Sequence, residues 1–207
     1  WIVSGGTLVS GDGTNEIVVD WGAAGAGSVQ VTATHACGPA APELLDVTIY
    51  SGIRSVQTGD WDDPLTWDCN CVPASTDNVV VSAGDSVYMV ANTTLQNLHV
   101  EEEGILYQPN YNLIVQGNYR IDGEHAGVAG GENIYLDGIN TEISGTGLIS
   151  NSTGLRIRYG NKTIPAGTRL NKPGNYNYVD ANVVVTNYGE ITFGYRLYAA
   201  NISSVWI

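Results

Sequence analysis

Basic residues are scarce in this chain, which has 8 Lys and Arg against 21 Asp and Glu and a formal net charge of −13. A protein that binds nucleic acid or an anionic membrane surface needs clusters of Lys and Arg to neutralise phosphate. The composition therefore argues against both partners. It is typical of a soluble, secreted protein whose copies repel one another unless a dedicated interface intervenes.

Long apolar runs are also absent. No stretch of 18 apolar residues predicts a transmembrane helix, and no basic stretch followed by an apolar core predicts a signal peptide. The chain instead holds 26 Gly and many Val, Ile, Thr and Tyr, which is an all-β composition. Both ends, Trp1–Val3 and Ser203–Ile207, read as strands, so we expect a segment of a longer protein.

Residues 94–123 show how most of the chain is organised. Short apolar bursts at Leu95–Val100, Ile105–Tyr107, Leu113–Val115 and Tyr119–Ile121 are too short for helices, and each is followed by a corner rich in Gly, Asn, Asp or Pro. Such a pattern is typical of a chain that winds rather than one that runs back and forth. It predicts a parallel β-helix, a solenoid that buries a narrow core by stacking, over residues 77–207.

Residues 1–50 follow a different rhythm, with turns about every ten residues, and this spacing predicts a partial β-sandwich. The strand candidates are Trp1–Val3, Thr7–Val9, Ile17–Asp20, Val29–Ala33 and Leu44–Ile49. The pattern W-x-V-x-G-G-T-x-x-x-G-x-G-T-N-x-I-x-V-x-W-G, followed by V-x-V-x-A-T-x-A-C-G, resembles the PKD-like, immunoglobulin-type domains of large bacterial surface proteins. The resemblance implies that the opening strands are missing. It also implies that Cys37 pairs with a cysteine on an upstream strand or on a neighbouring chain.

Residues 51–76 are predicted to form a connector and a tryptophan-containing cap. The pattern G-D-W-x-D-P-x-T-W…V-P-x-x-x-D-N-V-x-V-x-x-G-D-x-V resembles the G8-like portion of secreted β-helix proteins exported by the type IX route, over residues 57–123. That resemblance implies a right-handed β-helix capped by the segment that carries Trp61 and Trp67. Two indole rings suit this role because the open end of a solenoid exposes apolar surface and unpaired strand edges.

Three cysteines, Cys37, Cys69 and Cys71, leave at least one without a partner in the chain. Cys69 and Cys71 are candidates for a tight disulfide with each other, for bridges to Cys37 or to another segment, or for half of a metal site. A zinc site needs about four nitrogen or sulfur ligands, and the sequence holds no second cysteine pair.

Two further kinds of site are suggested by short motifs. Asp60, Asp62, Asp63 and Asp68 are candidate Ca²⁺ ligands, because hard cations take carboxylate oxygens, but the same residues suit a solvated turn. Ser86, in Asp-Ser-Val, resembles the acceptor of bacterial surface O-glycosylation.

A catalytic reading must also be considered, because polysaccharide lyases and hydrolases use β-helices. These enzymes need paired carboxylates, or Ca²⁺ with a basic residue, on one face of successive coils. Asp122, Glu124 and His125, beside a Gly-rich loop at 123–131, form the best candidate, whereas Glu101–Glu103 reads as a charged corner. Fold alone does not indicate an enzyme, and we predict that the chain has no catalytic activity and needs no cofactor.

Four tyrosines complete the candidate residues. Tyr107, Tyr111, Tyr119 and Tyr135 could line a sugar-binding face or form outward ladders that stiffen the coils.

The sequence as a whole predicts a non-catalytic structural module of a secreted, cell-surface adhesin or extracellular fibre. The expected partners are copies of itself or other segments of the same long protein, contacted through the strands at either end, and surface glycans. The alternative is a carbohydrate-binding or carbohydrate-active, lyase-like β-helix.

Overall fold

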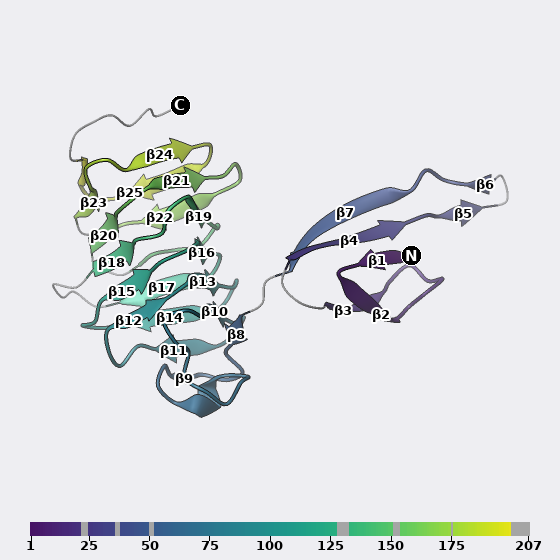
Figure 1. Ribbon diagram of the computed structural model, residues 1–207, viewed down its shortest axis with the longest axis horizontal. Helices are drawn as coiled ribbons and strands as arrows, with labels where there is room; N and C mark the ends of the chain where they lie inside the picture. The colour runs from purple at the N-terminus through teal and green to yellow at the C-terminus, as the bar shows by residue number, and fades with distance from the viewer. Residues whose placement is uncertain are drawn as a thin grey trace. The chain divides into compact units, whose positions relative to one another are not determined.

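The computed structural model describes residues 1–21, 25–35, 38–49, 52–127, 133–150, 154–174 and 176–199. It divides into two compact units, Trp1–Ser51 and Gly52–Ile207 (Figure 1). Within the described ranges the only helical element is one 3₁₀ turn, Pro64–Thr66, so the all-β prediction is confirmed. No helix in this part of the chain is long and apolar enough to cross a membrane.

The first unit is a set of antiparallel strands. Its strands are β1 (Ile2–Ser4), β2 (Gly6–Ser10), β3 (Val18–Trp21), β4 (Gly25–Val31), β5 (Thr34–His35), β6 (Gly38–Pro39) and β7 (Glu43–Ile49). One sheet has the order β1-β4-β7, while β2 pairs with β3 and β5 with β6. Ile2, Leu44 and Leu45 are each at least 60% exposed, and no described residue of this unit belongs to the buried hydrophobic core. Within this unit taken by itself, apolar side chains of β1 and β7 are therefore exposed.

The second unit is a solenoid of three parallel sheets, which we call sheets I, II and III (Figure 1). Sheet I contains β8 (Ile53–Arg54), β10 (Asn78–Val81), β13 (Asn97–Val100), β16 (Tyr119–Ile121), β19 (Thr141–Ser144), β21 (Asn161–Ile164) and β24 (Val184–Asn187). Sheet II contains β9 (Gly59–Asp60), β11 (Ser86–Tyr88), β14 (Ile105–Gln108), β17 (Glu124–Gly127), β22 (Arg169–Lys172) and β25 (Glu190–Phe193). Sheet III contains β12 (Thr93–Leu95), β15 (Leu113–Val115), β18 (Asn133–Leu136), β20 (Gly154–Ile157), β23 (Asn177–Val179) and β26 (Leu197–Ala199).

The chain visits the sheets in the order I, II, III and then begins again, as in β10, β11, β12 and β13. In sheet II, β22 and β25 form a separate two-strand ladder, which Leu148 joins to β17 by bridging to both Glu124 and Asn171. The predicted parallel β-helix is therefore present. Its right-handed sense stays a prediction.

Three segments contain more regular structure than the sequence indicated. The connector 51–76 already holds β8 and β9, which pair in parallel with β10 and β11. The Gly-rich loop predicted at 123–131 begins as β17, and the segment 160–175, without a clear apolar rhythm, forms β21 and β22. Backbone hydrogen bonds to the neighbouring coil supply this regularity, and they do not depend on the side chains.

Inward side chains form columns along the solenoid. In sheet III, Leu95, Val115, Leu136, Ile157 and Val179 lie opposite one another on successive strands, and each is at most 5% exposed. Fully burying one such side chain contributes about 1.5–3 kcal/mol. Stacked columns thus give each coil a core that it cannot form alone.

The corners between sheets I and II are tight. At the predicted charged corner, the Gly104 amide donates to the Glu101 carbonyl at 2.9 Å, and Glu103 has a φ of 64°. Two coils along, Gly145 has a φ of +113°, and a Cβ at this position would collide with the backbone of Ile121. This corner therefore requires glycine both for its conformation and for its close approach to the preceding coil.

Two lysines are buried in the solenoid, which the sequence pattern did not indicate. The Lys162 ammonium group donates to the carbonyls of Gly138, Arg158 and Tyr159, and Lys172 donates to the Gly174 carbonyl at 2.9 Å. Burial lowers the pKa of each lysine to about 8. Carbonyl groups at the corners thus replace water around these cations.

Candidate functional site

The Trp cap, residues Trp61 to Trp67, lies beyond β9 at the first edge of the solenoid (Figure 1). The two indole rings are 4% and 1% exposed and meet edge to face, with ring centroids 5.0 Å apart. The Trp67 Nε1 donates to the Trp61 carbonyl at 2.9 Å, and the Trp61 amide donates to the Tyr88 carbonyl at 2.8 Å. Both rings belong to the same hydrophobic core as the sheets, so they close it at this end.

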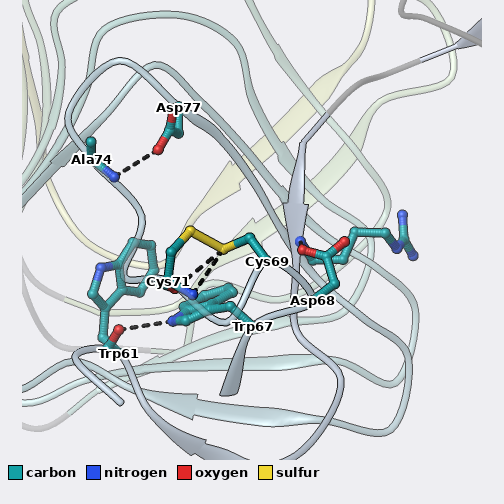
Figure 2. The surroundings of a disulfide bond; sticks show 8 residues. Trp61, Trp67, Asp68, Cys69, Cys71, Ala74 and Asp77 are labelled. Carbon is teal, nitrogen blue, oxygen red and sulfur yellow. Dashed lines mark hydrogen bonds between the residues drawn. A yellow bond between two sulfur atoms is a disulfide. The ribbon is translucent and has the colours of Figure 1, made fainter. Parts of the chain in front are cut away.

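A disulfide follows the cap directly. Cys69 is joined to Cys71, with a Cα–Cα distance of 5.1 Å, which is one of the alternatives that the sequence left open (Figure 2). Asn70 between them has a φ of 51°, and all three residues are exposed. The pair leaves Cys37 without another cysteine in the chain, and Cys37 itself lies outside the described residues.

We expect this disulfide to contribute little to stability, because it closes a loop of only three residues. The chain-entropy relation gives about 1.5 kcal/mol for so short a loop. Replacing both cysteines with serine should lower the melting temperature of the solenoid by about 3–6 °C in a circular dichroism melt. Adding reductant to the double variant should change nothing further. A drop of more than about 10 °C would show instead that the bond holds the Trp cap in place.

Two of the four aspartates proposed as Ca²⁺ ligands accept hydrogen bonds from backbone amides. The Asp63 side chain accepts from the Leu65 amide at 2.9 Å and caps the 3₁₀ turn, and the Asp68 side chain accepts from the Arg54 amide at 3.1 Å. Asp60 and Asp62 are exposed. Within the described ranges no three His, Cys, Asp or Glu side chains are grouped to hold a metal ion, so the carboxylates do not form a prearranged Ca²⁺ site.

The candidate catalytic residues Asp122, Glu124 and His125 do not converge on one site. His125 is fully buried, and its Nδ1 lies 2.8 Å from the hydroxyl of buried Tyr119, so it cannot meet a substrate. Asp122 accepts from the Arg120 Nε at 2.6 Å and lies 2.9 Å from the His99 Nε2. Burial alone would raise the pKa of Asp122, but these hydrogen bonds lower it overall. Glu124 lines an open groove, whereas Asp122 lines a separate, smaller hollow.

The four tyrosines predicted to line an outer face lie in different environments. Tyr119 is wholly buried in the core, and the prediction that it lines an outer face was wrong, because its position in β16 lies opposite inward Leu98. Tyr111 packs against the core. Tyr107 lies outside, 5.6 Å from Tyr88 on the neighbouring strand, and Tyr135 lies outside beneath the Arg158 guanidinium, which is 4.0 Å from its ring centroid.

A larger aromatic cluster, absent from the predictions, lies on the outer face of the last strands of sheet III. The Tyr178 and Tyr198 rings stack with centroids 5.4 Å apart, and the Arg156 guanidinium lies 5.9 Å from the centroid of Tyr178. Tyr176 stacks on Tyr198 in turn. These rings occur on successive coils, so a ladder of this kind could have been found by aligning the strands. Its members cover one another's faces, which suits stiffening of the coils.

One concave feature of the described surface is an open groove of about 560 Å³ at the corner between sheets I and II, which we call the sheet II groove. It is lined by Glu103, Gly104, Ile105, Gly123, Glu124, Thr146, Gly147, Leu148, Arg169 and Asn171. A second, smaller hollow of about 280 Å³ adjoins it through Thr146 and includes Arg120, Asp122 and Glu142. The two hollows place polar side chains from successive coils along one side of the solenoid.

The proposed glycosylation site, Ser86, lies in β11 and is half-buried, and its amide donates to the Thr58 hydroxyl at 2.9 Å. Modification there stays a prediction.

Comparison with known proteins identifies the first unit only. Residues 1–47 match the family model of the PKD-like domain. No curated protein and no solved structure matches the chain. Residues 1–47 are thus a PKD-like domain, and a β-solenoid follows it.

Proposed function

We propose that the chain is a non-catalytic structural module of a secreted, cell-surface adhesin or extracellular fibre. The observation that carries the proposal is the continuous parallel pairing of sheets I and III, in which each strand bonds to the strand one coil away. Stacked coils of this kind resist bending because every coil is bonded to both neighbours along its length. A stiff solenoid that follows a PKD-like domain in the sequence could serve as a spacer that presents or connects surface domains.

The absence of catalysis is part of the proposal and is supported by the candidate residues. Asp122 is held ionised by Arg120 and His99, so it is poorly suited to donate a proton. His125 is enclosed by the core. His125 therefore does not meet the requirement that a general acid or base lie within hydrogen-bond reach of a substrate.

An extracellular location is supported by three features of the chain. The PKD-like match covers residues 1–47, the net charge is −13, and the Cys69–Cys71 disulfide is exposed, a state that persists in oxidising surroundings. The resemblance of residues 57–123 to G8-like segments favours bacterial export by the type IX route.

Self-association is proposed through the first unit. In the described part of the chain β1 and β7 are the edges of their sheet, and Leu44 and Leu45 on β7 are exposed. An added strand from another copy, or from another segment of the same long protein, would cover such an edge. The other proposed contact segment, Ser203–Ile207, lies outside the described residues.

Immunolabelling of the source cells tests the proposed location. Antibodies raised against the purified chain should label intact cells, or fibres shed from them, as strongly as permeabilised cells. Brief protease treatment of intact cells should remove the signal, while a cytoplasmic marker protein is retained. Labelling that requires permeabilisation would contradict the proposal.

A further inference from the structure

The sheet II groove combines charged groups of both signs. Glu103 comes from one corner, Glu124 from the next coil, and Arg169 from a later coil. Four other arginines form ion pairs with carboxylates: Arg54, Arg120, Arg156 and Arg158. Arg169 is exposed and forms no ion pair with any described residue. Its guanidinium N–H groups are therefore available to a ligand, beside carboxylate oxygens that accept hydrogen bonds.

The groove also has an apolar part. Ile105, Glu124, Leu148 and Asn171 lie opposite one another along the outer face of sheet II, so aliphatic and polar side chains alternate from coil to coil. Two residues along β14 from Ile105, Tyr107 stands on the same outer face. Polar groups and an aromatic ring thus share one surface.

Tyr107 differs from the tyrosines of sheet III in what lies on either side of it. Tyr88 packs on the strand before it, but its partner on the following strand is Ala126, whose methyl group is too small to cover an aromatic ring. By contrast, Tyr178 has Arg156 on one side and Tyr198 on the other. On the side of Ala126, Tyr107 faces the coil that contributes Glu124 to the groove.

The charges of the groove select the chemical class of ligand. Two carboxylates against one guanidinium disfavour a polyanion, and the net charge of −13 adds to that repulsion. No group of three metal-ligating side chains exists in the described ranges, which disfavours a cation site. A neutral sugar carries hydroxyls that both donate and accept, so it matches carboxylate, amide and guanidinium groups together, and its C–H face can pack on Tyr107.

We propose that the sheet II groove binds a neutral oligosaccharide lying along the solenoid axis. In this arrangement Glu103 and Glu124 accept from sugar hydroxyls, Arg169 and Asn171 donate to them, and Tyr107 packs on a sugar face. The lining residues come from four successive coils, which span about 14 Å at ~4.8 Å per coil. The inference rests on the proposed function, because it supplies the adhesive surface of an adhesin.

Binding of the purified chain to an array of neutral oligosaccharides of glucose, mannose, galactose and xylose tests this inference, with polygalacturonate and alginate as acidic probes. We expect binding to at least one neutral probe and none to the acidic probes. Arg169→Ala and Tyr107→Ala should each weaken that binding at least about tenfold in calorimetry, which corresponds to about 1.4 kcal/mol. Tyr107→Phe should retain it, because the ring stays in place.

Matched controls separate the groove from a general effect on folding. Arg196→Ala and Tyr178→Ala change an exposed arginine and an exposed tyrosine outside the groove, and both should bind as the unmodified chain does. Melting temperatures identify any variant that is not folded. Binding to no neutral probe, binding only to the acidic probes, or equal losses in the control variants would each overturn the inference. Since the assay uses purified chain, a failure to label intact cells would contradict the proposed function alone.

Discussion

Replacing Trp67 with alanine is expected to lower the free energy of unfolding of the solenoid by about 4 kcal/mol. The indole is 1% exposed, packs edge to face on Trp61, and donates its N–H to the Trp61 carbonyl. Its removal leaves a cavity and an unpaired carbonyl at the end of the core. Urea denaturation followed by circular dichroism measures the loss.

The same turn offers a matched control. Leu65 lies two residues from Trp67 and is 63% exposed, so Leu65→Ala should change the free energy of unfolding by less than about 0.5 kcal/mol. Trp67→Phe should cost less than alanine, since most of the ring is retained. If Trp67→Ala cost less than about 1 kcal/mol, the indole would not act as a cap.

The second large effect that we expect is a loss of solenoid stability in mild acid, caused by the protonation of His125 in the unfolded chain. Burial, together with the nearby charge of Lys172, lowers the pKa of His125 from 6.5 to about 3. The unfolded chain therefore binds a proton below pH 6.5 that the folded chain does not, and stability falls as the pH drops from 6.5 towards 3. At pH 5 the expected loss is about 2 kcal/mol relative to pH 7 or above.

Other titrating groups act in different pH ranges. The pKa of Glu101 is lowered from 4.5: burial alone would raise it, but hydrogen bonds from Arg54 and the Ala83 amide lower it. The pKa of Asp122 is also lowered from its usual value of 3.8, because the effect of burial, which raises it, is outweighed by hydrogen bonds from Arg120 and His99. Stability from these two carboxylates is lost only below about pH 4.5. Lys162 and Lys172, each with a pKa lowered to about 8, are protonated throughout the acid range. Among these groups, only His125 changes the stability between pH 6.5 and 5.

A pair of variants tests this assignment. His125→Leu combined with Tyr119→Phe replaces both members of the buried hydrogen bond by apolar groups, so the free energy of unfolding should be nearly constant between pH 6.5 and 5. Tyr119→Phe alone keeps the buried imidazole and should keep the slope. Equal slopes in the double variant and the unmodified chain would refute the role of His125. Urea denaturation at several pH values provides the measurement.

Some of the candidate site could be predicted from local pattern. The Glu-Glu-Glu-Gly stretch was expected to turn, and it forms the corner at Glu101–Gly104. Trp61 and Trp67 were expected to cap the solenoid, and both indoles close its core. These predictions depend only on residues that are close in sequence, because turn preference and side-chain size are properties of the residues themselves.

Other residues could not be placed in this way. A shift of one residue in strand register moves a side chain from the core to the surface, so Tyr119 and His125 read as outward groups until the pairing with the neighbouring coil was known. The sheet II groove brings together residues as distant in sequence as Glu103 and Arg169, and only the number of residues in each coil decides that they meet.

The sequence by itself determined the all-β class, the change from a PKD-like domain to a winding solenoid, and the corners, because apolar period and turn residues are local properties. The tertiary structure alone decided which side chains face inward, that Lys162, Lys172 and His125 are buried, and that side chains from four coils share one groove. The physical reason is that hydrogen bonds between coils set the register, and the register determines whether each side chain meets the core or the solvent.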